Sequence, residues 1–539
     1  MKKIAKMMAT TFALCMAFGV CGTAVGCGGG TTVLVIDAGG QNVHYNSTKS
    51  QEYSPFNKYP YNTLEELVDV WNDANGDKYG YTFRVAESSI NNDNGTMGPM
   101  LNNGTAPEIL YYLPTTIAED QKKGWFYDLK DVMETPNVYS KAGEAGSVKW
   151  KDLYSAEDYN TFFSPDGQLF TVSMEKNPIG IMYNKTLFEA AGITETPTTF
   201  KEFMEAQDKI NAYAVSVGRG DKTADTTYIA PFRSVYTWYD LFIESSLMGP
   251  MMEYMDVVNV DGVLDAEEFV RGMFVRDADG NSLYSANSEI MQEVYRLIKL
   301  TTKYYPANHE SYYNEDQFVA GNVAMIEVTG GAIRKLADSA AEAPTPFEVG
   351  VFPYPVVESG TGSEYYTTAD ATYHVRRGLS GYSTGWAITN SAMNKDAQNG
   401  NTDCVDACID MLMYLSCFEN NDKMVNDLGF AIPLSGTTQN ANFTSLAAAY
   451  EADTTGANAD KALAWGCASL GGATNKSLYD TTVNIRKSLV NGSQTVAQVL
   501  DTLQASFKSN AQTLYDNNSW DSSAWPAYGV TRTDVKNGN

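Results

Sequence analysis

The sequence predicts an α/β protein with two lobes. Its 539 residues exceed the roughly 250–300 residues at which one hydrophobic core stops growing, so at least two cores are expected. Apolar residues make up 43% of the chain and aromatic residues 12%, which is typical of a globular protein and not of a disordered one. Strand-like and helix-like segments also alternate near the N-terminus, and this alternation indicates a parallel sheet covered by helices.

The first alternation lies close to the N-terminus. Residues 33–36 form an apolar run of strand length, and Asn62 can cap a helix whose apolar residues recur at helical spacing as far as Trp71. Asn75-Gly76 is expected to end this helix before a second strand at Tyr81–Ala86. A strand, a helix and a strand at this spacing predict a βαβ unit.

Four further elements follow from the same patterns. A third strand is expected at Glu108–Tyr112. Amphipathic helices are expected at Thr199–Ile210 and Asp403–Phe418, and a long C-terminal helix at Thr495–Tyr515. No repeat of 20–50 residues is visible, so a repeat architecture is not expected.

The first 26 residues have the pattern of an export signal. Lysines precede the apolar run Met7–Val20, which is too short to span a hydrocarbon core of about 30 Å at about 1.5 Å per helical residue. Small residues then precede Cys27, and this resembles the lipobox of bacterial lipoproteins. We expect cleavage after residue 26, a lipid on Cys27 and a flexible tether over residues 27–32. The protein would be exported and anchored on the outer face of the cell membrane, or in the periplasm if the cell has an outer membrane.

The charge and the remaining cysteines narrow the functional classes. A formal net charge of −27 argues against nucleic acid as a partner, because phosphates would be repelled. Cys404 and Cys408 lie one helical turn apart in an apolar segment, and Cys417 and Cys467 follow. A metal site and a disulfide are both conceivable, but helical spacing suits a disulfide poorly and no paired C-x-x-C or nearby His is present. Buried thiols are therefore the preferred interpretation.

Two short patterns are interpreted as coincidental. Gly381–Gly385 matches the G-x-S-x-G pattern of serine hydrolases, which requires a helix after it and a later acid and His. Here a strand-like segment begins at Trp386, and all three histidines precede it. The acidic segments 257–268 and 277–281 resemble calcium loops, but Val257 occupies the first ligand position, so turns are preferred. We therefore expect no cofactor, no catalytic residues and no metal site, with calcium binding by these acidic segments left open as a side hypothesis.

Short segments between residues 33 and 435 occur in an order that resembles the extracellular solute-binding proteins of bacterial ABC importers, in the carbohydrate-binding group (family 1). They include a G-x-x-P strand, a G-x-apolar-x-D-L turn and the run D-G, Y-N-K, A-G-I, P-T-T. In full, the segments are Gly104–Ile109, Gly124–Leu129, Asp166–Leu169, Ile181–Lys185, Ala191–Ile193, Pro197–Phe200, Phe318–Met325, Gly385–Ile388 and Gly429–Pro433.

The resemblance implies a two-lobe periplasmic-binding-protein-like fold of type II, with a ligand cleft between lobes that are joined by a hinge of several chain crossings. Crossings are expected near residues 172–178, near residues 386–390 and around Pro433. Lobe one would then comprise residues 32–174 and 388–432, and lobe two residues 175–387 and 433–539.

The same resemblance implies a role in capture. The protein would bind a carbohydrate, either a sugar or an oligosaccharide, and deliver it to the transmembrane permease of an ABC importer, acting as a monomer. Two alternatives stay open. One is a binding protein for a different polar solute, such as a peptide. The other is a surface adhesin or glycan-processing enzyme, in which two carboxylates about 5–9.5 Å apart could act as acid and base.

Sugar binding requires aromatic faces for the apolar side of the ring and polar groups for the hydroxyls. Trp386 opens the second expected crossing and is the leading candidate for stacking on a ligand. Tyr112 ends the third strand and Trp238 lies in an aromatic run, so each is either a core residue or a ligand platform. Glu175 and Asn177 occupy positions where the family presents polar groups to the ligand.

Four more residues are candidates for ligand contact. Asp370, Tyr373 and Tyr382 lie in the loop-rich stretch that leads to the second crossing. The family often places a Trp after the segment that ends at Met325, but this chain has no aromatic residue there. Glu327, which stands in that place, either points to the cleft or is solvated, and the identity of the sugar stays open.

Overall fold

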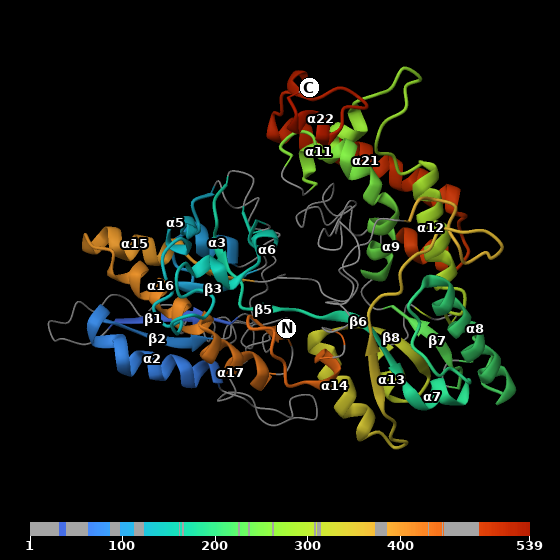
Figure 1. Cartoon of the computed structure of the whole chain (residues 1–539), viewed down its shortest axis with the longest axis horizontal. Helices are drawn as coiled ribbons and strands as arrows, with labels where there is room; N and C mark the ends of the chain where they lie inside the picture. The colour runs from blue at the N-terminus through green and yellow to red at the C-terminus, as the bar shows by residue number, and fades with distance from the viewer. Residues whose placement is uncertain are drawn as a thin grey trace, which may run out of the picture.

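The computed structural model consists of two α/β bodies, each built around its own sheet and joined by a narrow waist (Figure 1). It describes residues 32–38, 63–86, 97–112, 123–160, 162–163, 167–224, 227–234, 238–260, 264–306, 309, 314–371, 385–428, 431–444, 446 and 484–538. The expected export signal and Cys27 therefore lie outside the described residues, as does Cys467.

The first sheet contains the predicted βαβ unit. Its strand order is β2-β1-β3-β10-β4, with β1 parallel to both β2 and β3 and β10 antiparallel to its neighbours. The strands are β1 (Thr32–Asp37), β2 (Tyr81–Ala86), β3 (Ile109–Tyr112), β10 (Gly385–Ile388) and β4 (Thr171–Val172). Helix α2 (Thr63–Tyr79) connects β1 to β2.

Helix α2 differs from the prediction at its C-terminal end. It continues through Asn75-Gly76 to Tyr79, and the chain turns at Gly80, whose φ is +72°. Gly76 is buried, and a Cβ there would lie 3.1 Å from the Thr82 side chain. The glycine therefore permits a close approach of the helix to strand β2 instead of ending the helix.

Helices cover the first sheet. Helix α16 packs against both β10 and α2, and it ends at Ser416 where the prediction extended to Phe418. Cys404 and Cys408 on this helix are completely buried in the apolar core, as expected for core thiols. The helices of this body are α3 (Met97–Asn102), α5 (Lys130–Met133), η2 (Trp150–Leu153), α6 (Ala156–Asn160), α15 (Asn390–Asn399), α16 (Asp403–Ser416) and α17 (Phe418–Leu428).

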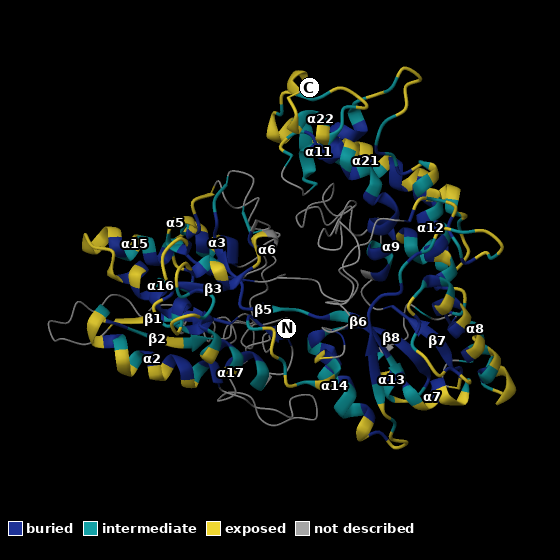
Figure 2. Ribbon diagram, in the orientation of Figure 1, coloured by how far each residue is buried: buried dark blue, intermediate teal, exposed yellow. Residues whose placement is uncertain are grey.

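The second sheet has the order β7-β8-β6-β9, with β7 parallel to β8 and the other pairs antiparallel. Figure 2 shows that its strands are buried while the outer faces of the surrounding helices are exposed. The strands are β6 (Ile179–Asn184), β7 (Ala230–Arg233), β8 (Val323–Thr329) and β9 (Val349–Phe352). The surrounding helices are α7 (Lys185–Ala190), α8 (Phe200–Ser216), α9 (Trp238–Met248), η3 (Gly249–Met251), α10 (Met252–Met255), α11 (Ala266–Phe274), α12 (Glu289–Thr301), α13 (Asn314–Val319) and α14 (Gly330–Ala341).

The C-terminal part of the chain extends the second body. It consists of α21 (Val496–Asn518), η4 (Ser522–Ala524) and α22 (Arg532–Lys536), and α21 packs against α11 and α12. The predicted start of α21 is confirmed: Thr495 forms a capping box with Gln498, which satisfies the first free N–H groups of the helix.

The order of the described strands requires three chain crossings between the bodies. Strand β5 (Glu175–Lys176) connects β4 to β6 and pairs with β11 (Ile432–Pro433), and a third connection runs from β9 to β10. The third connection enters the first sheet before Gly385, so residues 385–387 belong to that sheet and not to lobe two as predicted. Gly385 lies between β3 and β4, where a Cβ would lie 2.6 Å from Thr171, so only a glycine lets β10 start there.

Candidate functional site

The strand ends of both sheets meet at the waist. In the first sheet β10 begins where β3 and β4 end, because Gly385 pairs with Tyr112 and Trp386 with Val172. In the second sheet β6 begins where β8 ends, because Ile179 pairs with Thr329. Only the short β5 segment separates β4 from β6, so these two edges face one another across the waist. In open α/β sheets, ligands bind outside the carboxyl ends of the strands, which makes these edges the candidate site.

Trp386 is not placed to stack on a ligand. Its side chain is 0% exposed and belongs to the apolar core of the first body. The ring packs edge-on against Tyr111, with 5.0 Å between the ring centroids. Strand β10 is an inner strand of the first sheet, so the indole is enclosed and its faces are not open to a ligand. In this structure Trp386 is therefore scaffold.

Glu175 lies on the waist strand β5 and is buried. Its carboxylate accepts a hydrogen bond from the hydroxyl of Tyr111 at 2.7 Å. Tyr111 directly precedes Tyr112, the last residue of β3. Asn177 follows β5 and is half-buried. The structure thus brings Glu175, Asn177 and the β3 end together at the waist, although the side chain of Tyr112 lies outside the described part of the chain.

Glu327 lies inside the second body and is neither solvated nor open to the waist. Its side chain is only 1% exposed. One carboxylate oxygen accepts hydrogen bonds from the backbone N–H of Tyr239 at 2.6 Å and the hydroxyl of Tyr354 at 2.9 Å. The other oxygen accepts from the hydroxyl of Ser234 at 2.7 Å. Glu327 therefore ties together the end of β7, the start of α9 and the segment after β9, all at the interlobe edge.

A buried ion pair lies near Glu327. Arg486 and Asp240 approach to 3.0 Å, and their side chains are 14% and 12% exposed. Burial raises the pKa of Asp240 to about 6, although the positive charge of Arg486 acts in the opposite direction. The sequence analysis missed this pair because 246 positions separate the two residues and no motif contains them. Trp238 begins α9 next to Tyr239, but its side chain lies outside the described residues.

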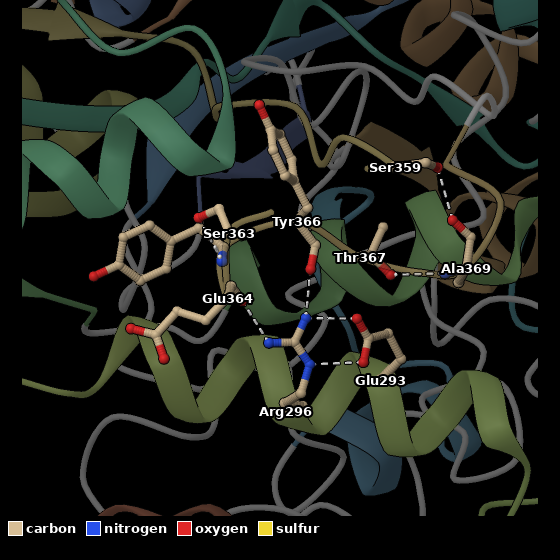
Figure 3. A network of polar contacts seen from close by, with 9 residues as sticks. Glu293, Arg296, Ser359, Ser363, Glu364, Tyr366, Thr367 and Ala369 are labelled. Carbon is tan, nitrogen blue, oxygen red and sulfur yellow. Dashed lines mark hydrogen bonds and ion pairs between the residues drawn. The ribbon is translucent and has the colours of Figure 1, made fainter. Parts of the chain in front are cut away.

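Asp370 differs from the other described candidates in its exposure to solvent. It is exposed and lies near the end of the segment 353–371, which leads from β9 toward the crossing. Arg296 on α12 holds that segment, as Figure 3 shows: its guanidinium pairs with Glu293 and donates to the carbonyl oxygens of Glu364 and Tyr366, both at 2.7 Å. Tyr373 and Tyr382 lie outside the described residues.

The two acidic segments that resemble calcium loops have other roles in the described part of the chain. Asp277 accepts hydrogen bonds from the backbone N–H groups of Asp279 and Asn281 in a tight turn at Gly280. Glu268 forms a capping box at the start of α11. Within the described ranges, no three His, Cys, Asp or Glu side chains gather as metal ligands would. None of the described helices combines the length and apolar character that crossing a bilayer requires.

Comparison with known proteins identifies the family to which this architecture belongs. A model of the family described as bacterial extracellular solute-binding protein matches residues 67–449. No curated protein matches the chain significantly.

Three solved structures share the fold. A family 1 extracellular solute-binding protein from Bifidobacterium longum subsp. infantis is 16% identical, with a TM-score of 0.54 over 89% of this chain and 100% of that one. RafE from Streptococcus pneumoniae in its apo form is 18% identical, with a TM-score of 0.53 over 90% and 99%. The maltose-binding periplasmic protein MalE from Listeria monocytogenes, solved in complex with maltose, is 14% identical, with a TM-score of 0.52 over 91% and 100%.

These likenesses confirm the predicted two-lobe fold. The family match covers well over half of the chain, including the second sheet and every strand of the first sheet except β1. The chain therefore belongs to the bacterial extracellular solute-binding proteins.

Proposed function

We propose that this protein captures a carbohydrate between its lobes and delivers it to the permease of an ABC importer. The observation that carries the proposal is the meeting of two sheet edges at a waist of three chain crossings, because rotation there can enclose a solute. Capture by closure needs no chemical step, so we propose that the protein is not an enzyme.

The choice of a carbohydrate is supported by the ligands of proteins with the same fold. The Listeria monocytogenes protein was solved with maltose, a RafE protein with raffinose, and another neighbour is described as a chitin oligosaccharide binding protein. The aromatic content of this chain, with 34 Tyr and 8 Trp, supplies rings that could stack on a sugar.

We assign the proposed contacts to the edges that face the waist. Glu175 on β5 and Asn177 just after it would provide hydrogen bonds, while Tyr112 at the end of β3 and Trp238 at the start of α9 would provide aromatic faces. Asp370, Tyr373 and Tyr382 stay as further candidates. In this proposal Glu327 positions α9 and does not bind the sugar itself. The proposed first lobe comprises residues 32–174 and 385–432.

A calorimetric screen tests the proposal. The purified protein would be titrated with mono- and oligosaccharides and, separately, with short peptides, and each mixture would be analysed afterwards by chromatography. We expect saturable binding of a saccharide that is recovered unchanged. Recovery of cleaved saccharide would indicate a glycan-processing enzyme, and binding of peptides alone would indicate a different transported solute.

The proposed anchor makes a separate prediction. The small residues before Cys27 indicate that a lipid is attached to this thiol after cleavage. Cys27→Ala should yield a protein that partitions into the aqueous phase of a detergent extraction, whereas the parent partitions into the detergent. Equal partitioning of the two proteins would contradict the anchor, and Cys417→Ala, which alters a buried thiol, serves as the control.

A further inference from the structure

Helix α17 holds two of the three crossing segments. Strands β5 and β11 lie side by side at the waist, with Glu175 paired to Pro433. Asn421 on α17 is completely buried, and its amide nitrogen donates to the Met174 carbonyl at 2.8 Å. Its amide oxygen accepts from the backbone N–H of Leu434, also at 2.8 Å. One side chain therefore binds the residue before β5 and the residue after β11.

The contact continues along the crossing that follows β11. Asp422 accepts a hydrogen bond from the Ser435 hydroxyl at 2.5 Å. Asn426 donates to the Thr437 carbonyl and accepts from the Gln439 N–H, both at 3.0 Å. We call Asn421, Asp422 and Asn426 the α17 clasp.

The clasp belongs to the first lobe and its partners lead into the second. Helix α17 packs against α16 and α2. Phe443 and Leu446 enter the apolar core beside β6 and β8, to which Ile432 on β11 also belongs. Side chains of α17, in lobe one, therefore form hydrogen bonds with the backbone of residues 434–439. These residues follow Pro433, around which the crossing was expected.

We infer that the α17 clasp fixes the pivot of the hinge, so that the β5–β11 pair and residues 434–439 move with lobe one. In these two crossings, bending would then be confined to residues 177–178 and to residues 440–442, where a helix begins, because hinges are a few loop or element-terminal residues between segments held rigidly on either side. Pro178 has a fixed φ, which concentrates rotation on the remaining torsions. Asn421 and Asn426 are accordingly positioning residues for capture, and the inference rests on the proposed function.

One further contact crosses the pivot. Arg334 on α14 of the second body donates to the Asp427 carbonyl near the C-terminal end of α17, at 3.2 Å. The last carbonyl groups of a helix have no intrahelical partner, so an arginine can bind one without disturbing the helix. This bond is expected to change as the lobes rotate, whereas the clasp bonds are expected to persist.

Hydrogen exchange of the ligand-free protein, read by mass spectrometry, tests the clasp bonds. In Asn426→Ala the Gln439 amide should exchange about threefold to tenfold faster, the range expected when one intramolecular hydrogen bond is lost. Asn421→Ala should have the same effect on the Leu434 amide. Asn137→Ala is the matched control, because Asn137 is equally buried in lobe one but donates to the Met413 carbonyl, away from the waist. It should leave residues 434–439 unchanged.

Interlobe distances test the pivot itself. Fluorophores would be attached to unnatural amino acids at Val148 in lobe one and Val215 in lobe two, which are 71% and 60% exposed. The distance distribution of the ligand-free protein should broaden in Asn421→Ala and Asn426→Ala but not in Asn137→Ala. Because Asn426 is only half-buried, its variant should fold even if Asn421→Ala does not.

The outcomes separate this inference from the carbohydrate assignment. Neither measurement uses a ligand, so a protein that binds no saccharide can still support the clasp. Unchanged exchange at Gln439, or an unchanged distance distribution in folded Asn426→Ala, would overturn the inference whatever the ligand is.

Discussion

At the scale of single residues, burial decides the role of Trp386. The sequence predicted a stacking platform because the residue opens a strand after a loop-rich stretch. The structure encloses the ring between Tyr111, which lies 275 positions earlier in the sequence, and the apolar core that includes residues of α16. A local pattern could not reveal this enclosure, because it depends on which segments cover both faces of β10.

The enclosed ring leads to a stability prediction. Trp386→Ala should lower the free energy of unfolding by about 3–5 kcal/mol, the usual cost of removing a buried aromatic side chain. Trp386→Phe should cost less and leave ligand affinity unchanged. Denaturant unfolding and calorimetry would measure the two effects. A Phe variant that is fully stable but binds sugar at least tenfold more weakly would show that Trp386 contacts the ligand after all.

Glu327 gives a second prediction at this scale. Its three donors come from Ser234, Tyr239 and Tyr354, and removing the carboxylate would leave them buried without this acceptor. Each such loss costs about 1–3 kcal/mol, so Glu327→Ala should destabilise the protein by about 3 kcal/mol or more. Glu327→Gln keeps one acceptor oxygen and should cost distinctly less. Equal unfolding midpoints for the two variants would argue against the hydrogen-bond account.

At the scale of elements, local sequence patterns correctly predicted helix starts where a neighbouring side chain caps the helix. The capping residues Thr199 and Thr495 mark the starts of α8 and α21 where the sequence predicted them. The predicted end of α2 was wrong, because Gly76 lies within the helix and allows β2 to pack closely against it instead of forming a turn. Tertiary packing determines the role of such a glycine, and a single sequence does not show which segments will pack together.

Helix α11 carries a pH prediction. Burial, with the nearby charges of Asp265 and Asp256, raises the pKa of Glu268 to about 9, against about 4.3 in an unfolded chain. Between these values the folded state binds the extra proton, so this group stabilises the protein at low pH and the benefit is lost as the pH rises toward 9. In Glu268→Gln, which has no proton to release, this loss of stability with rising pH should be absent.

Chemical denaturation between pH 5 and 9 measures the effect. The free energy of unfolding of the parent should fall relative to that of Glu268→Gln as the pH rises. Glu289→Gln, which alters an exposed carboxylate at the start of α12, should leave a constant difference from the parent. Parallel curves for the parent and Glu268→Gln would contradict the raised pKa.

At the scale of the whole molecule, the order of short segments predicted the two-lobe fold, which the family match and the two separate sheets confirm. The ligand contacts were less accessible to sequence reasoning. Of the nine predicted contact residues, Trp386 and Glu327 are buried within separate lobes, and Asp370 is exposed. Which side chains face the opposite lobe depends on how the two bodies meet, and spacing along one chain does not determine that geometry.

The central claim is that the two lobes close on an unreacted sugar. Small-angle X-ray scattering with and without each saccharide of the panel tests it most directly. We expect a saccharide that binds in calorimetry to reduce the radius of gyration at saturation, because rotation at the waist brings the lobes together. A bound, saturating saccharide that leaves the scattering profile unchanged would contradict the account.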